Sequence, residues 1–136
     1  MTTRKIIEEI EAILKASSDV DFASTGALEP LASESNQKAV YISLEEVAVE
    51  SVRLNTNSSA YDRHMLISLY CNYDGSEDPL GVYDFIDGVE KSMLSDSAIW
   101  SSIVDRDIVA IDYDNQEHTP KRAITMLFDF TYRLTC

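Results

Sequence analysis

The chain has 136 residues, of which 24 are Asp or Glu and 11 are Lys or Arg, and its formal net charge at pH 7 is −13. This length predicts a single domain with an ordinary hydrophobic core, stable without a metal or a disulfide. The charge argues against proteins that grip phosphate backbones or anionic membranes, because such binding needs clustered Lys and Arg. An acidic surface serves either solubility or a surface that repels or resembles nucleic acid.

The sequence predicts neither a membrane span nor a signal peptide. Its apolar runs are far shorter than the ~20 residues that a spanning helix needs. Near the N-terminus the apolar residues are interrupted by Glu8, Glu9 and Glu11. We therefore expect a protein that folds in the cytoplasm of the cell that makes it. In that compartment the two cysteines, Cys71 and Cys136, are predicted to be free thiols.

The first predicted element is a helix over about Thr3 to Ala16, with Thr2 or Thr3 as its N-cap. Its apolar residues recur with helical spacing and form one stripe: Ile6, Ile7, Ile10, Ile13 and Leu14. A short strand is predicted over Val20 to Thr25. Gly26 to Gln37 follows as an irregular loop, because Gly, Pro and a Ser/Asn cluster punctuate it.

Two long strands joined by a polar turn come next. Lys38 to Leu54 alternates in strand fashion, but the parity of its apolar positions shifts near Glu45 and Glu46. That shift indicates either a β-bulge or two separate strands. Ala60 to Tyr73 is the second strand, and the two are expected to form a hairpin. The turn between them consists of Asn55, Thr56, Asn57, Ser58 and Ser59.

A second helix is predicted over about Leu80 to Ser95, after a turn at Asp74 to Pro79. Asp78 is its expected N-cap, with Pro79 at the first helical position. Two glycines within it weaken the helix and would permit close approach to a sheet. The apolar stripe consists of Val82, Ile86, Val89 and Met93, and the glycines are Gly81 and Gly88.

A strand over Val104 to Asp114 and a turn over Asn115 to Lys121 precede the closing strand, Arg122 to Cys136. The odd positions of the closing strand are polar apart from Leu127, and its even positions are all apolar: Ile124, Met126, Phe128, Phe130, Tyr132 and Leu134. A period of two over this length means a β-strand with one buried face. The order of elements predicts an α+β fold, a mainly antiparallel β-sheet with two helices packed on one face.

Candidate chemistry is sparse. Asp74 to Asp78 and Asp112 to Glu117 alternate oxygen ligands, but neither continues as a calcium-binding loop of the EF-hand type. We interpret the first as a turn before a helix and the second as an acidic hairpin tip. Zinc could in principle be bound by His64, Cys71, His118 and Cys136. Their spacing lacks the local pairs of ligands that structural zinc motifs have.

Motifs of catalysis are lacking too. The chain has four glycines and no Gly-rich phosphate loop, and it has no Gly-x-Ser-x-Gly elbow. We therefore expect no catalytic residue, no cofactor and no metal. No feature of the sequence indicates an enzyme. A pocket in which Asp, His and Tyr converge would revive that alternative.

The layout of the chain resembles that of the tail terminator (tail-completion) proteins of long-tailed bacteriophages. The shared features are an amphipathic first helix, a meander with a polar loop, a middle helix and two closing strands that end in an aromatic-rich Tyr-Arg run. The matching pieces are Ile6–Leu14, Met65–Tyr73, Val82–Met93 and Ala123–Leu134. The likeness covers nearly the whole chain and is one of length and layout, because the family has no sharp motif.

This resemblance implies a virion structural protein that assembles in the host cytoplasm and ends in the virion tail. The subunits would form a homo-oligomeric ring, a hexamer, that caps the tail tube, stops its polymerisation and offers a face to the head–tail connector protein. DNA would pass through the lumen without specific binding, and acidic charge would let it slide. No membrane takes part.

On this hypothesis certain surfaces are expected to meet partners. The polar segments Gly26–Gln37 and Asn55–Ser59 would contact neighbouring subunits or the tail tube protein. Leu127, on the second face of the closing strand or at its free edge, would contact a neighbouring subunit. Asp112 and Asp114 would lie near a charged surface.

Two alternatives stay open. One is another adaptor protein of the head–tail neck, which would share the fold and the ring but bind the connector first. The other is an acidic inhibitor that mimics DNA, which predicts carboxylates in a regular stripe along one face. Along the sequence the acidic residues are spread among turns and both helices, and this weakens the second alternative.

Overall fold

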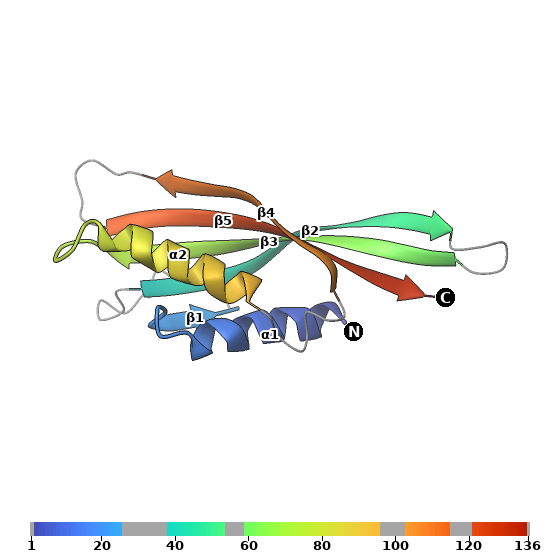
Figure 1. The fold of residues 1–136 in the computed structure, drawn as a ribbon, viewed down its shortest axis with the longest axis horizontal. Helices are drawn as coiled ribbons and strands as arrows, with labels where there is room; N and C mark the ends of the chain where they lie inside the picture. The colour runs from blue at the N-terminus through green and yellow to red at the C-terminus, as the bar shows by residue number, and fades with distance from the viewer. Residues whose placement is uncertain (1, 26–37, 54–58, 96–102, 115–120, 136) are drawn as a thin grey trace.

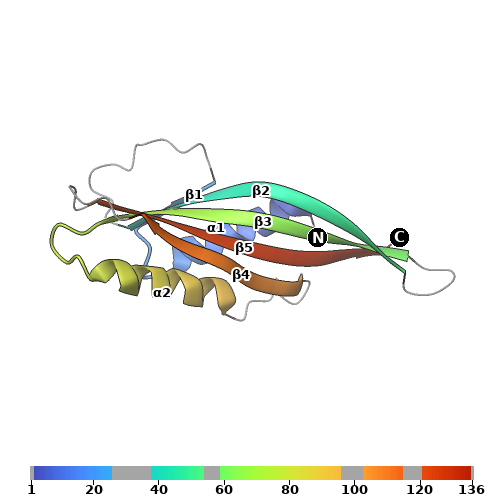
Figure 2. The same cartoon turned by 90° about the horizontal axis from the view of Figure 1, so that it is seen from above.

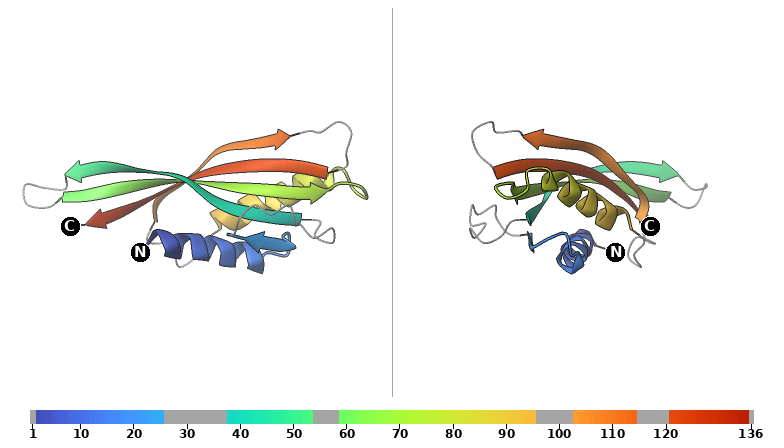
Figure 3. Two further views of the ribbon diagram at one scale, coloured as in Figure 1. Left: turned by 180° about the vertical axis from the view of Figure 1, so that it is seen from behind. Right: turned by 60° about the vertical axis from the view of Figure 1, so that its left-hand side comes forward.

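The computed structural model of the chain describes residues 2–25, 38–53, 59–95, 103–114 and 121–135. The elements follow the order α1 (Thr3–Ala16), β1 (Phe22–Ser24), β2 (Lys38–Arg53), β3 (Ser59–Asp74), α2 (Gly81–Leu94), β4 (Ile103–Asp114) and β5 (Lys121–Thr135). The strands form one sheet in the order β1-β2-β3-β5-β4, side by side in Figure 2. β1 runs parallel to β2, and the other neighbours are antiparallel. Both helices lie on one face of the sheet (Figure 3), so the predicted α+β fold is confirmed.

Helix α1 begins and ends where the sequence predicts. The side-chain oxygen of Thr2 accepts a hydrogen bond from the backbone N–H of Lys5 at 3.2 Å, which is the expected N-cap. The buried side of the helix consists of Ile6, Ile10 and Leu14, and each contributes roughly 1.5–3 kcal/mol through burial before entropy is subtracted. The predicted apolar stripe therefore lies against the sheet.

Strand β2 is a single strand with a β-bulge at the predicted place. Leu44 pairs with Ile67 and Glu46 with Leu66, so Glu45 is the extra residue. Its carboxylate accepts a hydrogen bond from the hydroxyl of Tyr70 at 2.7 Å. This bond lowers the pKa of Glu45 and raises the pKa of Tyr70. The bulge is thus tied to the neighbouring strand by its own side chain.

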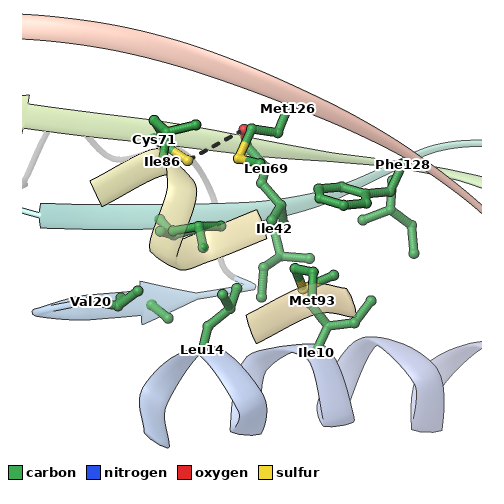
Figure 4. Packing of buried hydrophobic residues seen from close by; sticks show 14 of the residues in the cluster. Ile10, Leu14, Val20, Ile42, Leu69, Cys71, Ile86, Met93, Met126 and Phe128 are labelled. Carbon is green, nitrogen blue, oxygen red and sulfur yellow. Dashed lines mark hydrogen bonds between the residues drawn. The ribbon is translucent and has the colours of Figure 1, made fainter. Parts of the chain in front are cut away.

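The core lies between the two helices and the middle of the sheet. Figure 4 shows side chains from α1, α2, β2, β3 and β5 converging there. On β5 the even-numbered residues are fully buried from Ile124 to Tyr132. Leu134 is exposed, however, so the predicted buried face ends one position early. β5 also lies between β3 and β4, so the expectation that the closing strand has a free edge beside Leu127 is wrong.

The sheet is longer than its helices. Figures 1 and 3 show β2, β3 and the end of β5 continuing past the N-terminus of α1. We call this projecting part the arm, and it consists of Val49–Arg53, Ser59–Arg63 and Arg133–Thr135. Leu134 is exposed because it belongs to the arm, where neither helix reaches.

Helix α2 begins later than predicted. Leu80 occupies the N-cap position without a side-chain hydrogen bond, and the helix starts at Gly81. The predicted roles of Asp78 as N-cap and Pro79 as first helical residue are therefore wrong. The backbone carbonyl of Asp78 instead accepts hydrogen bonds from the Gly81 N–H at 3.1 Å and from the Tyr73 hydroxyl at 2.8 Å. This turn, anchored to β3, sets where the helix starts.

The two glycines of α2 have different neighbours. A Cβ added at Gly81 would collide with the hydroxyl of Tyr73, so this glycine permits the predicted close approach to the sheet. A Cβ added at Gly88 would lie 2.5 Å from Oδ2 of Asp19, in the connection between α1 and β1. Gly88 therefore accommodates that connection rather than the sheet.

We predict that Gly81→Ala lowers the free energy of unfolding by about 1–3 kcal/mol, the usual cost of overpacking. The new methyl group displaces the Tyr73 hydroxyl from the carbonyl of Asp78. Urea unfolding measures the loss. In a Tyr73→Phe background the hydroxyl is gone, and the same substitution is expected to cost less. Equal costs in both backgrounds would contradict the explanation.

Candidate interaction surfaces

One side of the sheet faces away from both helices, and we call it the open face. On β5 it carries the odd-numbered residues, among them Leu127. Leu127 is half-buried and lies between Ser68 of β3 and Ala110 of β4. Within the described part of the chain no helix covers this face. The structure therefore places Leu127 on an uncovered surface.

Five aspartates gather along one edge of the open face, and we call them the aspartate stripe. Their strand neighbours place them on that face: Asp105 pairs with Thr131, Asp107 with Asp129, Asp112 with Thr125 and Asp114 with Ala123. The four residues of β4 are exposed, and Asp129 of β5 is half-buried. Asp112 and Asp114, predicted to lie near a charged surface, belong to this stripe.

A β-bulge in β4 brings the stripe onto a single face. Ile108 pairs with Phe128 and Ala110 with Leu127, so Val109 is the extra residue. From Asp105 to Asp107 the odd-numbered residues face outward, and downstream of Val109 the even-numbered ones do. Ile111 and Tyr113 consequently pack towards the core.

Sequence reasoning missed this arrangement because it considered Asp112 to Glu117 only as an acidic hairpin tip. Asp112 and Asp114 lie at the end of β4, within the predicted strand Val104 to Asp114, and residues 115–117 are outside the described residues. The sequence does contain a signal of the bulge, because the aspartates occupy odd positions at Asp105 and Asp107 and even positions at Asp112 and Asp114.

The stripe is electrostatically unfavourable for the folded chain. Asp107 stands directly opposite Asp129, and like charges in that position repel. The pKa of Asp107 is raised, first by the charge of Asp105 and then by desolvation, by a hydrogen bond to Asp105 and by the charge of Asp129. Oδ1 of Asp129 is buried and lacks a hydrogen-bond partner among the described residues, with Nδ1 of His64 3.8 Å away. A local arrangement that opposes folding is a candidate for function.

A polar network joins the stripe to the arm. Both carboxylate oxygens of Asp62 accept hydrogen bonds from Arg133, from Nε at 2.7 Å and from Nη2 at 3.1 Å. This fork lowers the pKa of Asp62 and raises the pKa of Arg133. The ring nitrogens of His64 lie 3.0 Å from Oγ1 of Thr131 and 3.3 Å from Oε2 of Glu50. His64 thus links β3 to both neighbouring strands.

The described residues do not bring together the zinc site considered from sequence. His64 lies on the open face and Cys71 in the core, on opposite sides of β3. Cys71 is a free thiol, as predicted, and burial raises its pKa to about 12. His118 and Cys136 are outside the described residues. Among the described residues, no group of three or more His, Cys, Asp or Glu side chains is placed to hold a metal ion.

Other predicted segments are located only in part. Residues 26–37 and 55–58, which include Asn55, Thr56, Asn57 and Ser58, lie outside the described residues. Ser59 is the first residue of β3 and pairs with Arg53, so its assignment to the turn is wrong. In the other acidic turn, Oδ1 of Asp74 accepts hydrogen bonds from the backbone N–H and the hydroxyl of Ser76. That turn is held by its own side chains.

Comparison with known proteins yields little. No protein-family model matches the chain, and no curated protein matches it. The chain is similar to a chain in a solved structure that is described as "Virion of native gene transfer agent (GTA) particle". The two share 14% sequence identity, with a TM-score of 0.44. That match covers 92% of this chain and 84% of the other. A likeness of this degree assigns no role to this chain. No helix of the described residues is long and apolar enough to cross a membrane.

The Asp62–Arg133 fork predicts an acid-sensitive contribution to stability. Because the pKa of Asp62 is lowered from its ordinary 3.8 on folding, the contribution is present in full above that pH. It declines as the pH falls below 3.8 and is lost below the lowered pKa. We expect the difference in free energy of unfolding between the wild type and Asp62→Asn to shrink over this range, measured by urea unfolding at successive pH values. A difference that stays constant with pH would contradict this assignment, and Asp84→Asn, at an exposed site on α2, is the control.

Proposed function

We propose that this protein is a structural subunit of a phage tail terminator ring. The ring caps the tail tube, ends its polymerisation and provides the interface for the head–tail connector protein. The role is architectural rather than catalytic, and the subunits form a homo-oligomer, a hexamer, first in the host cytoplasm and then in the virion tail. The observation that carries the proposal is the aspartate stripe on a sheet face that the described helices leave open.

The stripe suits a surface past which DNA must move. Side chains two residues apart on a strand are ~7 Å apart, so the carboxylates form a closely spaced row of like charge. A row of carboxylates at this spacing repels the phosphate backbone and offers no basic group to hold it. In a ring whose open faces turn inward, Asp105, Asp107, Asp112 and Asp114 would line the lumen.

The contacts expected from the sequence remain part of this proposal. Leu127 lies on β5, one strand further in than the four aspartates of β4, where a half-buried apolar side chain can meet a neighbouring subunit. Residues 26–37 and 55–58, which lie outside the described residues, would meet neighbours or the tail tube protein.

We expect the purified protein to form closed rings, alone or on the ends of tail tubes, and to stop the growth of tubes in vitro. Light scattering and electron microscopy measure the first, and tube length with and without the protein measures the second. A monomer at high concentration that neither forms rings nor changes tube length would contradict the proposal. Rings that bind connector protein but not tube protein would indicate a neck adaptor instead.

A second candidate function gains support from the same stripe. An acidic inhibitor that mimics DNA needs carboxylates in a row along one face, and the fold supplies such a row although the sequence seemed to scatter them. In this case the stripe would attract a DNA-binding protein rather than repel DNA.

Neutralising the stripe separates the two functions. Asp105, Asp107, Asp112 and Asp114 are replaced together by Asn, and the matched control replaces four acidic residues of the helices, Glu8, Glu9, Asp84 and Asp87, by the corresponding amides. For a DNA-conducting ring, we expect rings of the stripe variant to retain double-stranded DNA in co-sedimentation at low salt, and rings of the control not to. Equal retention by both variants would contradict the lumen assignment. Salt-sensitive binding of the wild type, but not of the stripe variant, to a purified nuclease would favour the inhibitor.

A further inference from the structure

The arm carries three exposed apolar side chains. They lie on the same face of the sheet that the two helices cover elsewhere. Val49 is 61% exposed, Tyr61 39% and Leu134 37%. Tyr61 stands directly opposite Leu134, and Val49 is opposite Arg63, two residues along β3 from Tyr61. The three are therefore neighbours on one surface, which we call the arm patch. It continues the apolar face of the core into a region that neither α1 nor α2 covers (Figure 1).

Polar contacts around Tyr132 separate the arm patch from the core. The hydroxyl of Tyr132 accepts a hydrogen bond from Nη1 of Arg63 at 2.8 Å and lies 3.3 Å from Oγ1 of Thr3. The guanidinium of Arg63 also lies over the ring of Tyr132, 5.6 Å from its centroid. Tyr132 is fully buried by these contacts. The core thus ends at the polar contacts of Tyr132. The arm patch lies beyond them and is a separate surface.

The arm is held in shape without a covering element. On its other side Arg133 bridges to Asp62 with two hydrogen bonds, and this ties β5 to β3 within the arm itself. A surface that is ordered before it binds loses less entropy on binding. Neighbouring exposed apolar residues on such a surface mark an interaction site, and tyrosine is enriched at interfaces.

Charge favours a second copy of this chain as the occupant. The arm carries Glu50 and Asp62 against Arg53, Arg63 and Arg133, which is a formal charge of +1 (three minus two), whereas the whole chain carries −13. Copies of so acidic a chain repel one another, and they approach at least cost where the local charge is not negative. A basic partner would be drawn to the aspartate stripe instead.

The opposite end of the molecule offers a surface that fits. Leu80 is 72% exposed and Tyr83 49% exposed, and these two residues, three apart at the start of α2, form what we call the end patch. The ring of Tyr83 packs against the ring of Tyr113 at 5.5 Å between centroids, which steadies it. Figure 1 shows the start of α2 at one end of the elongated molecule and the arm at the other.

We propose that the arm patch of one copy docks on the end patch of a second copy. Because the two patches differ and lie at opposite ends, the contact is head-to-tail, and its repetition closes a ring when the rotation from one copy to the next divides a full turn. This contact would be the repeating interface of the proposed ring. The contact itself does not depend on the proposed function, but its closure into a terminator ring does.

Cross-linking between two marked chains tests the contact. In a Cys136→Ser background, chains with Tyr61→Cys are mixed with chains with Tyr83→Cys and treated with a short bifunctional maleimide. Cys71 does not react, because it is buried and its pKa is about 12. We expect cross-linked dimers in the mixture and not with either chain alone. Leu44→Cys, at a site that is 38% exposed, replaces Tyr61→Cys in the matched control and should give none.

Association of the Tyr61→Ser/Leu134→Ser variant gives an independent measure. We expect its self-association, followed by sedimentation over a range of concentrations, to weaken by roughly tenfold or more. Its unfolding midpoint in urea should stay unchanged, as is usual for surface substitutions away from structural contacts. Leu44→Ser should leave association unchanged.

The outcomes distinguish this inference from the proposed function. Cross-linking of Tyr61→Cys chains to one another, no cross-link in the mixture, or a monomer throughout would overturn the head-to-tail contact. Rings that persist in the arm variant would also overturn it, and the terminator ring would stand. Mixed cross-links in a protein that neither forms rings nor stops tube growth would sustain the contact and overturn the terminator function.

Discussion

The antiparallel pairing of β3 with β5 is the constraint on which the rest of the structure depends. It aligns Met65 with Phe130, Ile67 with Phe128 and Leu69 with Met126, so that two strands present one continuous apolar face. Both helices pack on that face, and the described elements leave the other face open. Since side chains alternate along a strand, every outer strand must keep the same parity or expose apolar residues. Register shifts restore that parity where the sequence departs from it. β2 has one, at Glu45, and β4 has two, between Ile103 and Asp105 and between Ile108 and Ala110.

Much of this fold can be predicted from the sequence where the pattern is long. Helix α1, the closing strand and the bulge of β2 follow from periodicity over ten or more residues. The start of α2 could not be predicted in this way, because Asp78 and Pro79 satisfy local capping rules. The decisive contact, from the hydroxyl of Tyr73 to the carbonyl of Asp78, joins a strand to the turn that follows it. Similarly, Leu134 continues an apolar pattern whose burial depends on how far α1 reaches along the sheet.

The candidate surfaces depend on register, which a single strand does not contain. Asp107 and Asp129 are 22 positions apart in sequence, and only the pairing of β4 with β5 sets them opposite each other. Asp112 and Asp114 share the face of Asp105 and Asp107 only because of the bulge at Val109. The scattered acidic residues of the sequence therefore become a stripe in the fold. That result removes the objection that was raised against a DNA-mimicking surface, and it gives the lumen hypothesis a specific face.

In the ring that we propose, the stripe and the arm have separate tasks. Charge that repels DNA also repels other copies of the same chain, and the repulsion grows as subunits gather. Such a ring needs its carboxylates on one surface and its subunit contacts on another, where the local charge is not negative. The sheet meets both needs with one set of strands, because the open face of β4 carries the aspartates and the opposite face of the arm carries Tyr61 and Leu134. The fork between Asp62 and Arg133 matters to both, since it neutralises a carboxylate next to the stripe and braces the strands that present the arm patch.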